Sequence, residues 1–214
     1  MFSSQDLING VRMTQLNDPD ATTWPDATLI IALNQALKIL ALVRPDATSK
    51  IAILSLTEGS RQFIPNDGVR LLNVVRNINS DNSIGVAVRL VQREDMDSMS
   101  PDWHVAKGTV VREYMFDSRS PRHFYIYPSV PAGKKLEIEY SSYAADVNIE
   151  NVIEPLPVDA IFAQPLQELM LYKLLSGDSS NGNSGAAHLQ TAMDLLGVKD
   201  KADERVSSAR RTSI

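Results

Sequence analysis

TWPDATLIIALNQALKILALVR, residues Thr23 to Arg44, is the stretch that decides the fold. A helix turns by about 100° per residue, which places the apolar side chains of this stretch on one broad arc. The arc contains Leu29, Ile30, Leu33, Ala36, Leu37, Leu40 and Val43. The narrow opposite strip contains Thr28, Ile31, Asn34, Gln35, Lys38 and Leu42. A helix this apolar must be covered on most sides, either by a large bundle of its own chain or by a neighbouring subunit.

Both ends of this helix carry recognisable signals. Thr23 and Asp26 have the spacing of a capping box, and Pro25 suits the first turn, where its missing N–H costs nothing. Arg44 precedes Pro45, and proline disfavours helix in the residue before it. We therefore predict a helix that begins with a capping box and ends at Arg44.

The middle of the chain changes to a strand-like pattern. Residues 51–143 hold nine of the thirteen aromatic residues, which favours β-structure. Short apolar runs separated by turn residues indicate a sandwich or an open barrel, and 93–103 interrupts them with a helical turn. The predicted strands are Ile51–Leu56, Arg61–Ile64, Leu71–Ile78, Ile84–Val91, Thr109–Phe116, His123–Tyr127 and Leu136–Ser142.

Helical spacing occupies both ends of the chain. Ser3 or Ser4 can cap a first short helix, and helical patterns return over 158–176 and 186–196. We predict an α+β fold: a helical bundle formed by the N- and C-terminal helices, with an inserted antiparallel β-sandwich or open-barrel domain. The predicted boundaries are 1–50 and 152–198 for the bundle, 51–151 for the β domain, and 199–214 for a flexible tail.

Composition narrows the class of protein. The chain has 214 residues, 43% of them hydrophobic, and a formal net charge of -5, so it can bury one good core or two smaller ones. It has no cysteine, which excludes disulfides and thiolate chemistry. Its first residues lack the basic start and apolar run of a signal peptide. Asn34, Gln35 and Lys38 argue against a membrane span of the apolar helix.

The sequence contains no convincing catalytic constellation. Phosphate-loop, nucleophile-elbow, zinc-protease and dinucleotide motifs are missing, and the three histidines have no metal-ligand spacing. Glu137 and Glu139 share one strand face, whereas a glycosidase pair usually comes from separate elements. We predict no catalytic residue, no metal site and no cofactor.

Two features are suited to contacts with other molecules. Trp103 and His104 either pack into the core or form a surface for another protein. The last ten residues contain Arg205, Arg210 and Arg211 and no acid. This basic end suits a protein contact, a nucleic-acid contact or no contact at all, and the acidic chain favours protein over nucleic acid.

Five segments together resemble a known family, the head-to-tail adaptors of short-tailed bacteriophages. They are WPDATLIIALNQALKILALVRPDA, QFIPNDGVRLLNVVRN, SPDWH, RHFYIYPSVPAGKKLEIEYS and AAHLQTAMDLLGVK. The resemblance runs from about Trp24 to Lys199. It implies a helical bundle with a β domain, in a ring of about twelve copies between the portal protein and the tail nozzle or tail fibre proteins.

The resemblance also implies where and how the protein works. It would be made in the host bacterial cytoplasm and act in the virion neck, without contact with a membrane. Double-stranded DNA would pass through the ring without sequence-specific binding, because the acidic charge of the protein repels the phosphates. Three sets of contact residues are expected: the subunit interface at Ile31, Gln35, Lys38 and Leu42, the portal-docking tail at Arg205, Arg210, Arg211 and Ile214, and a tail-protein contact at Trp103 and His104.

Two other functions stay open at this point. One is another virion tail component, such as a tail-completion or minor tail protein, which only its copy number and neighbours in the particle would separate. The other is a cell-wall-degrading virion enzyme that uses Glu137 with an acidic partner. Clearing of cell walls by the purified protein would identify this enzyme.

Overall fold

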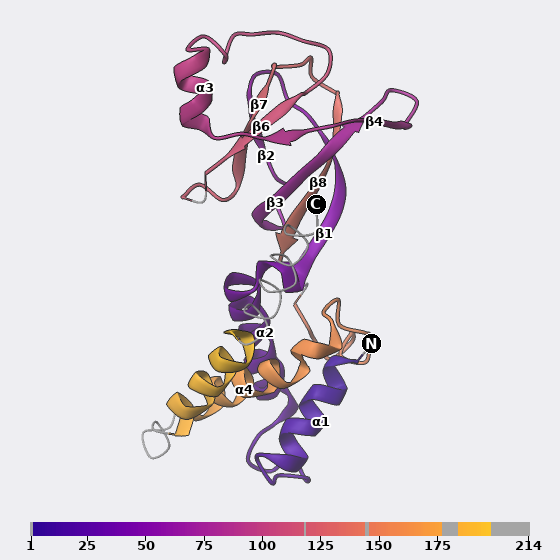
Figure 1. Ribbon diagram of the computed structural model, residues 1–214. Coiled ribbons are helices and arrows are strands. Elements are labelled where there is room, and N and C mark those ends of the chain that lie inside the picture. The colour runs from indigo at the N-terminus through magenta and orange to yellow at the C-terminus, as the bar shows by residue number, and fades with distance from the viewer. Residues whose placement is uncertain (1, 118, 144–145, 177–183, 198–214) are drawn as a thin grey trace, which may run out of the picture. The chain divides into compact units, whose positions relative to one another are not determined.

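The structure, a computed structural model, describes residues 2–117, 119–143, 146–176 and 184–197. The chain forms two compact units, Met1–Ala47 with Ala144–Ile214, and Thr48–Tyr143 (Figure 1). We call them the helical unit and the β unit. The first contains helices from both ends of the chain and the second contains two sheets, so the predicted α+β class is confirmed.

The helical unit is built around the apolar helix α2, Asp26–Val43. Helices α1, Ser4–Thr14, and α4, Ala163–Leu175, pack against α2. A short 3-10 turn, η2, Ala160–Phe162, leads into α4, and a last helix covers 184–197. The shared core includes Leu7, Val11, Leu29, Leu33, Ala36, Leu40, Leu166, Leu169, Met170, Ala192 and Leu196.

The start of α1 follows the sequence prediction. Ser3 is its N-cap, and Ser3 and Asp6 form a capping box in which each side chain accepts a hydrogen bond from the other residue's backbone N–H. The bond from the Ser3 backbone N–H lowers the pKa of Asp6 below its usual 3.8. The negative charge therefore stays at the positive end of the helix dipole, where it is stabilising.

The start of α2 corrects the sequence prediction. Its N-cap is Pro25 without any side-chain cap, so the capping box of Thr23 and Asp26 is wrong. The backbone N–H groups of Thr23 and Trp24 instead donate to the carboxylate of Asp18, at 3.2 and 2.8 Å. The predicted capping box does not form because the carboxylate of Asp18, in the loop before α2, already accepts hydrogen bonds from these N–H groups.

Asp18 also forms an ion pair with Arg12 of α1. Both side chains are buried, and Arg12 Nη1 lies 3.5 Å from the Asp18 carboxylate. Arg12 further donates to the Trp24 carbonyl, at 2.8 Å, and pairs with Asp26 in the first turn of α2. The two helices are thus joined by one polar network at the end where α2 begins.

Substitution of Asp18 by asparagine should reduce the acid sensitivity of folding. Burial acts to raise the pKa of Asp18, but hydrogen bonds from Trp24, Thr22 and Thr23 outweigh it, so the pKa lies below 3.8. A lowered folded-state pKa adds stability that is complete above pH 3.8 and is lost as pH falls below it. Urea unfolding at pH values from about 6 downward should show a higher free energy of unfolding for the wild type than for Asp18→Asn. This difference should shrink below pH 3.8. Exposed Asp20→Asn is the control, and an advantage that persists in acid would contradict this role.

The β unit consists of two four-stranded sheets. The first has the order β1-β8-β3-β4 and the second the order β2-β7-β6-β5. All neighbours are antiparallel except β5 and β6. The strands are β1 Ser49–Ser55, β2 Arg61–Phe63, β3 Gly68–Ile78, β4 Ile84–Ala87, β5 Arg89–Leu90, β6 Glu113–Phe116, β7 His123–Tyr127 and β8 Lys135–Ser142. Two short helices complete the connections, η1 Pro45–Thr48 and α3 Arg93–Met99.

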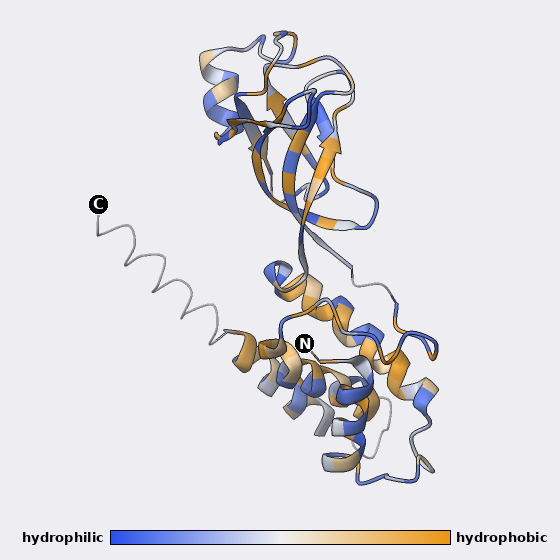
Figure 2. Cartoon of the chain, turned by 90° about the vertical axis from the view of Figure 1, so that its right-hand side faces the viewer, coloured by the Kyte–Doolittle hydropathy of each residue, from blue (hydrophilic) through white to orange (hydrophobic). Residues whose placement is uncertain are grey.

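Alternating burial along the strands creates the core of the β unit. Phe124 and Ile126 of β7 and Leu136 and Ile138 of β8 are fully buried, while their chain neighbours are only partly so. Figure 2 shows hydrophobic and hydrophilic residues alternating along these strands. Two predicted strands differ from the structure. Ile84–Val91 divides into β4 and β5, which belong to different sheets, and only the second half of Thr109–Phe116 is a strand, β6. Val88 between β4 and β5 is buried in the core.

Candidate subunit interface

One exposed strip runs along α2. The four residues predicted to contact a neighbouring subunit, Ile31, Gln35, Lys38 and Leu42, are all exposed. Their spacing of four, three and four residues places them on one line of the helix. Ile31 is 58% and Leu42 62% exposed, although each lies beside a buried alanine of the same helix. We call this line the α2 strip.

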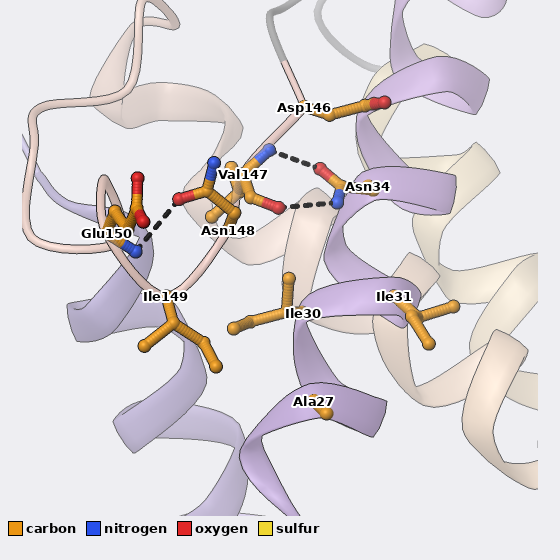
Figure 3. A pocket seen from close by; sticks show the side chains of 9 residues that line it. All are labelled: Ala27, Ile30, Ile31, Asn34, Asp146, Val147, Asn148, Ile149 and Glu150. Carbon is orange, nitrogen blue, oxygen red and sulfur yellow. Dashed lines mark hydrogen bonds between the residues drawn. The ribbon is translucent and has the colours of Figure 1, made fainter.

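A groove lies beside the first half of the α2 strip. It has a volume of about 610 Å³ and lies between α2 and residues 146–150 (Figure 3). Ala27, Ile30 and Ile31 form one wall, and Ile149, which is 74% exposed, lies on the other. The groove is therefore open and mainly apolar, with carboxylates at its edge from Asp146 and Glu150.

The wall opposite α2 is held by a pair of hydrogen bonds between the side chain of Asn34 and the backbone of Val147. The Asn34 side chain donates to the Val147 carbonyl at 2.9 Å and accepts from the Val147 N–H at 2.8 Å (Figure 3). Lys38 of the α2 strip lies 3.2 Å from Asp146, in an exposed ion pair. Val147 is buried in the helical core, so the segment before residue 152 packs with the helices, whereas the predicted boundary placed it in the β domain.

Sequence reasoning did not find this groove. Asn34 was assigned to the polar strip of α2 on helical spacing, whereas its partner Val147 lies 113 positions away. The only signal in the sequence was an asparagine between apolar residues of a buried helix, because a half-buried amide needs a partner. The sequence does not indicate which segment provides that partner.

The helix that carries the strip is also long and apolar enough, by length and composition alone, to cross a membrane. The core helix of a globular unit passes the same test. Eight of its residues are buried against the rest of the helical unit: Leu29, Ile30, Ala32, Leu33, Ala36, Leu37, Leu40 and Ala41.

The structure separates the two residues predicted to contact a tail protein. Trp103 is completely buried in a small core with Met96 and Met115. His104 is exposed, stacks on the Trp103 ring at 3.6 Å, and shares a hydrogen bond of 2.8 Å with Ser60. A partner on this surface would therefore touch His104 and not Trp103.

Glu137, the carboxylate considered for a glycosidase, is engaged elsewhere. Glu137 accepts two hydrogen bonds of 3.1 Å from the Arg76 guanidinium, across neighbouring strands. Across the described ranges, no group of three or more His, Asp or Glu side chains could hold a metal ion. The predicted portal-docking residues Arg205, Arg210, Arg211 and Ile214 lie outside the described residues.

Exposed apolar side chains gathered on a helix and the adjacent loop are typical of a surface that contacts another molecule. The chain belongs to the SU10 adaptor protein family, whose model matches residues 3–213. This is a family of phage head-to-tail adaptors, which is structural and not enzymatic, so the resemblance seen in the sequence is confirmed.

No curated protein matches the chain. Among solved structures, the chain is similar to one in the neck of an empty GTA particle, with 15% sequence identity and a TM-score of 0.30. The match covers 78% of this chain and 74% of that chain.

Proposed function

We propose that this protein assembles as a ring beneath the phage portal, joins it to the tail nozzle and forms part of the channel through which DNA passes. The observation that carries the proposal is the α2 strip with its groove, apolar surface that the helical unit leaves uncovered in a chain of an adaptor family. We expect about twelve copies in the ring.

A second copy is the proposed cover for the α2 strip. Burying an exposed isoleucine or leucine fully contributes roughly 1.5–3 kcal/mol, so Ile31 and Leu42, each more than half exposed, together offer about 2 kcal/mol per interface. A ring repeats that gain at every interface. Ring contacts are head-to-tail, so the strip must meet a different surface of the neighbour.

The distribution of charge supports passage of DNA. Residues 1–47 and 144–214 contain nine Lys and Arg but fifteen Asp and Glu, whereas residues 48–143 contain twelve and eleven. The acidic charge of the chain is therefore concentrated in the helical unit. Because DNA affinity grows with the number of phosphates that a protein neutralises, an acidic unit facing the channel would let DNA slide.

The remaining proposed contacts are at the portal and the tail. The basic end with Arg205, Arg210, Arg211 and Ile214 is proposed to dock onto acidic and apolar surface of the portal. The exposed surface around His104 is proposed to meet the tail protein. Neither contact requires a cofactor or a metal ion.

Mixing the purified protein with portal rings tests the proposal. Wild-type protein should bind as a ring of one fixed copy number, measured by the mass and imaging of the complex. The Ile31→Glu/Leu42→Glu variant should keep its circular dichroism but form no ring, because each interface would have to bury carboxylates. Deletion of Arg205–Ile214 should preserve the fold and abolish attachment to the portal.

Met13→Glu is the matched control, since Met13 is 61% exposed on α1 and lies outside the α2 strip. This variant should assemble like the wild type. Normal rings from the doubly charged variant would show that α2 is not the interface. Wild-type protein that never binds the portal would refute the adaptor role itself.

A further inference from the structure

The first sheet of the β unit has two free edges. Its order is β1-β8-β3-β4, so β1 and β4 are the outer strands within the part of the chain that the structure describes (Figure 1). Each edge strand carries two exposed β-branched apolar residues. Ile51 and Ile53 on β1 are 71% and 57% exposed, and Ile84 and Val86 on β4 are 66% and 59% exposed.

The β1 edge lacks most of the usual protection against pairing with another chain, and the β4 edge has only part of it. Proteins protect edge strands with charged residues, prolines, bulges or very short strands. β1 has seven residues and pairs with β8 in unbroken register, and its one charge, Lys50, lies 3.2 Å from Asp67 in an ion pair. β4 has neither a charge nor a proline in IGVA; its protection is its four-residue length and the register shift in its pairing with β3.

The directions of the strands make the two edges complementary. β1, β8, β3 and β4 are antiparallel to each neighbour in turn, so β4 runs opposite to β1. When the β4 edge of one copy lies beside the β1 edge of the next, the sheet continues with the same antiparallel alternation. The unpaired backbone N–H and C=O groups of each edge then become partners.

We infer that the β4 edge of one copy pairs with the β1 edge of the next, so that the first sheet continues from subunit to subunit. This inference rests on the proposed ring. Because β4 and β1 are different surfaces, the contact is head-to-tail, as a ring requires, and it leaves a free edge for the next copy. Pairing of β1 with β1 would instead close a two-fold dimer and leave Ile84 and Val86 exposed.

Disulfide trapping tests the pairing directly, because the chain has no cysteine of its own. Residues directly opposite on antiparallel strands have Cα atoms about 4.5–5.5 Å apart, within the range that a disulfide spans. Four double variants combine Ile51→Cys or Ile53→Cys with Ile84→Cys or Val86→Cys, to cover the registers in which these exposed residues lie opposite one another. Each is assembled on portal rings, oxidised and run on a non-reducing gel.

At least one double variant should give a ladder of covalent oligomers, while each single-cysteine variant stays monomeric. The control Met13→Cys/Met99→Cys has two exposed residues that belong to neither edge strand and should give no ladder. Covalent dimers from Ile51→Cys or Ile53→Cys alone would overturn the inference in favour of two-fold pairing. Rings without a ladder in any double variant would overturn it while leaving the adaptor role intact. Wild-type protein that forms no ring would overturn both.

Discussion

Replacement of Trp103 by alanine is expected to lower the free energy of unfolding of the β unit by about 3–5 kcal/mol. The side chain is completely buried, its ring stacks on His104 at 3.6 Å and meets Tyr125 edge-on at 5.7 Å. Its indole N–H donates to Asp97 at 2.8 Å. The substitution removes the largest fully buried side chain of the protein and leaves a cavity that its neighbours can fill only in part.

Urea unfolding followed by circular dichroism measures this loss. Met99→Ala is the control, because Met99 lies on the neighbouring helix α3 with 83% of its surface exposed, and it should change stability by less than about 0.5 kcal/mol. A Trp103→Ala protein of normal stability that no longer joins the tail would show that the side chain serves a partner and not the core.

Trp103 shows where sequence patterns no longer predict which side chains are buried. Along β7, Phe124 is buried, whereas its neighbour Tyr125 and the following Tyr127 are only partly buried. Strand periodicity assigns faces because successive side chains must point to opposite sides. Residues 100–108 lie outside the predicted strands and have no strand period, so the sequence left Trp103 open between core and surface.

Local capping signals were right at one helix and wrong at another for a physical reason. Ser3 and Asp6 interact within a single turn, and the side chain of each accepts the backbone N–H of the other. At α2, the buried carboxylate of Asp18 takes the N–H groups of Thr23 and Trp24. A capping box depends on four residues, whereas Asp18 is positioned by the packing of two helices.

The α2 strip could be predicted from the sequence, and the groove beside it could not. Helical spacing placed Ile31 and Leu42 on the face opposite the apolar arc, and both are exposed. The groove depends on residues 146–150, which fold against α2 through Asn34. Its second wall therefore arises from a tertiary contact, about which periodicity along one helix says nothing.

Two leucines of α2 should respond in opposite ways to the same substitution. Leu33 is completely buried among the helices, so Leu33→Ala should lower the free energy of unfolding of the helical unit by about 3 kcal/mol. Leu42 is 62% exposed on the α2 strip, so Leu42→Ala should change stability by less than about 0.5 kcal/mol. Leu42→Ala should nevertheless weaken ring formation, which Leu33→Ala should preserve at temperatures where it stays folded.

Thermal unfolding and ring formation on portal, measured on the same protein samples, separate these two effects. The pair is informative because both substitutions remove the same atoms from the same helix and differ only in what surrounds them. If Leu42→Ala destabilised the monomer as much as Leu33→Ala, its side chain would be part of the monomer's own core. If it changed neither property, no neighbour would cover the α2 strip at this position. A loss of assembly with unchanged stability is the result expected of a side chain that only a second subunit buries.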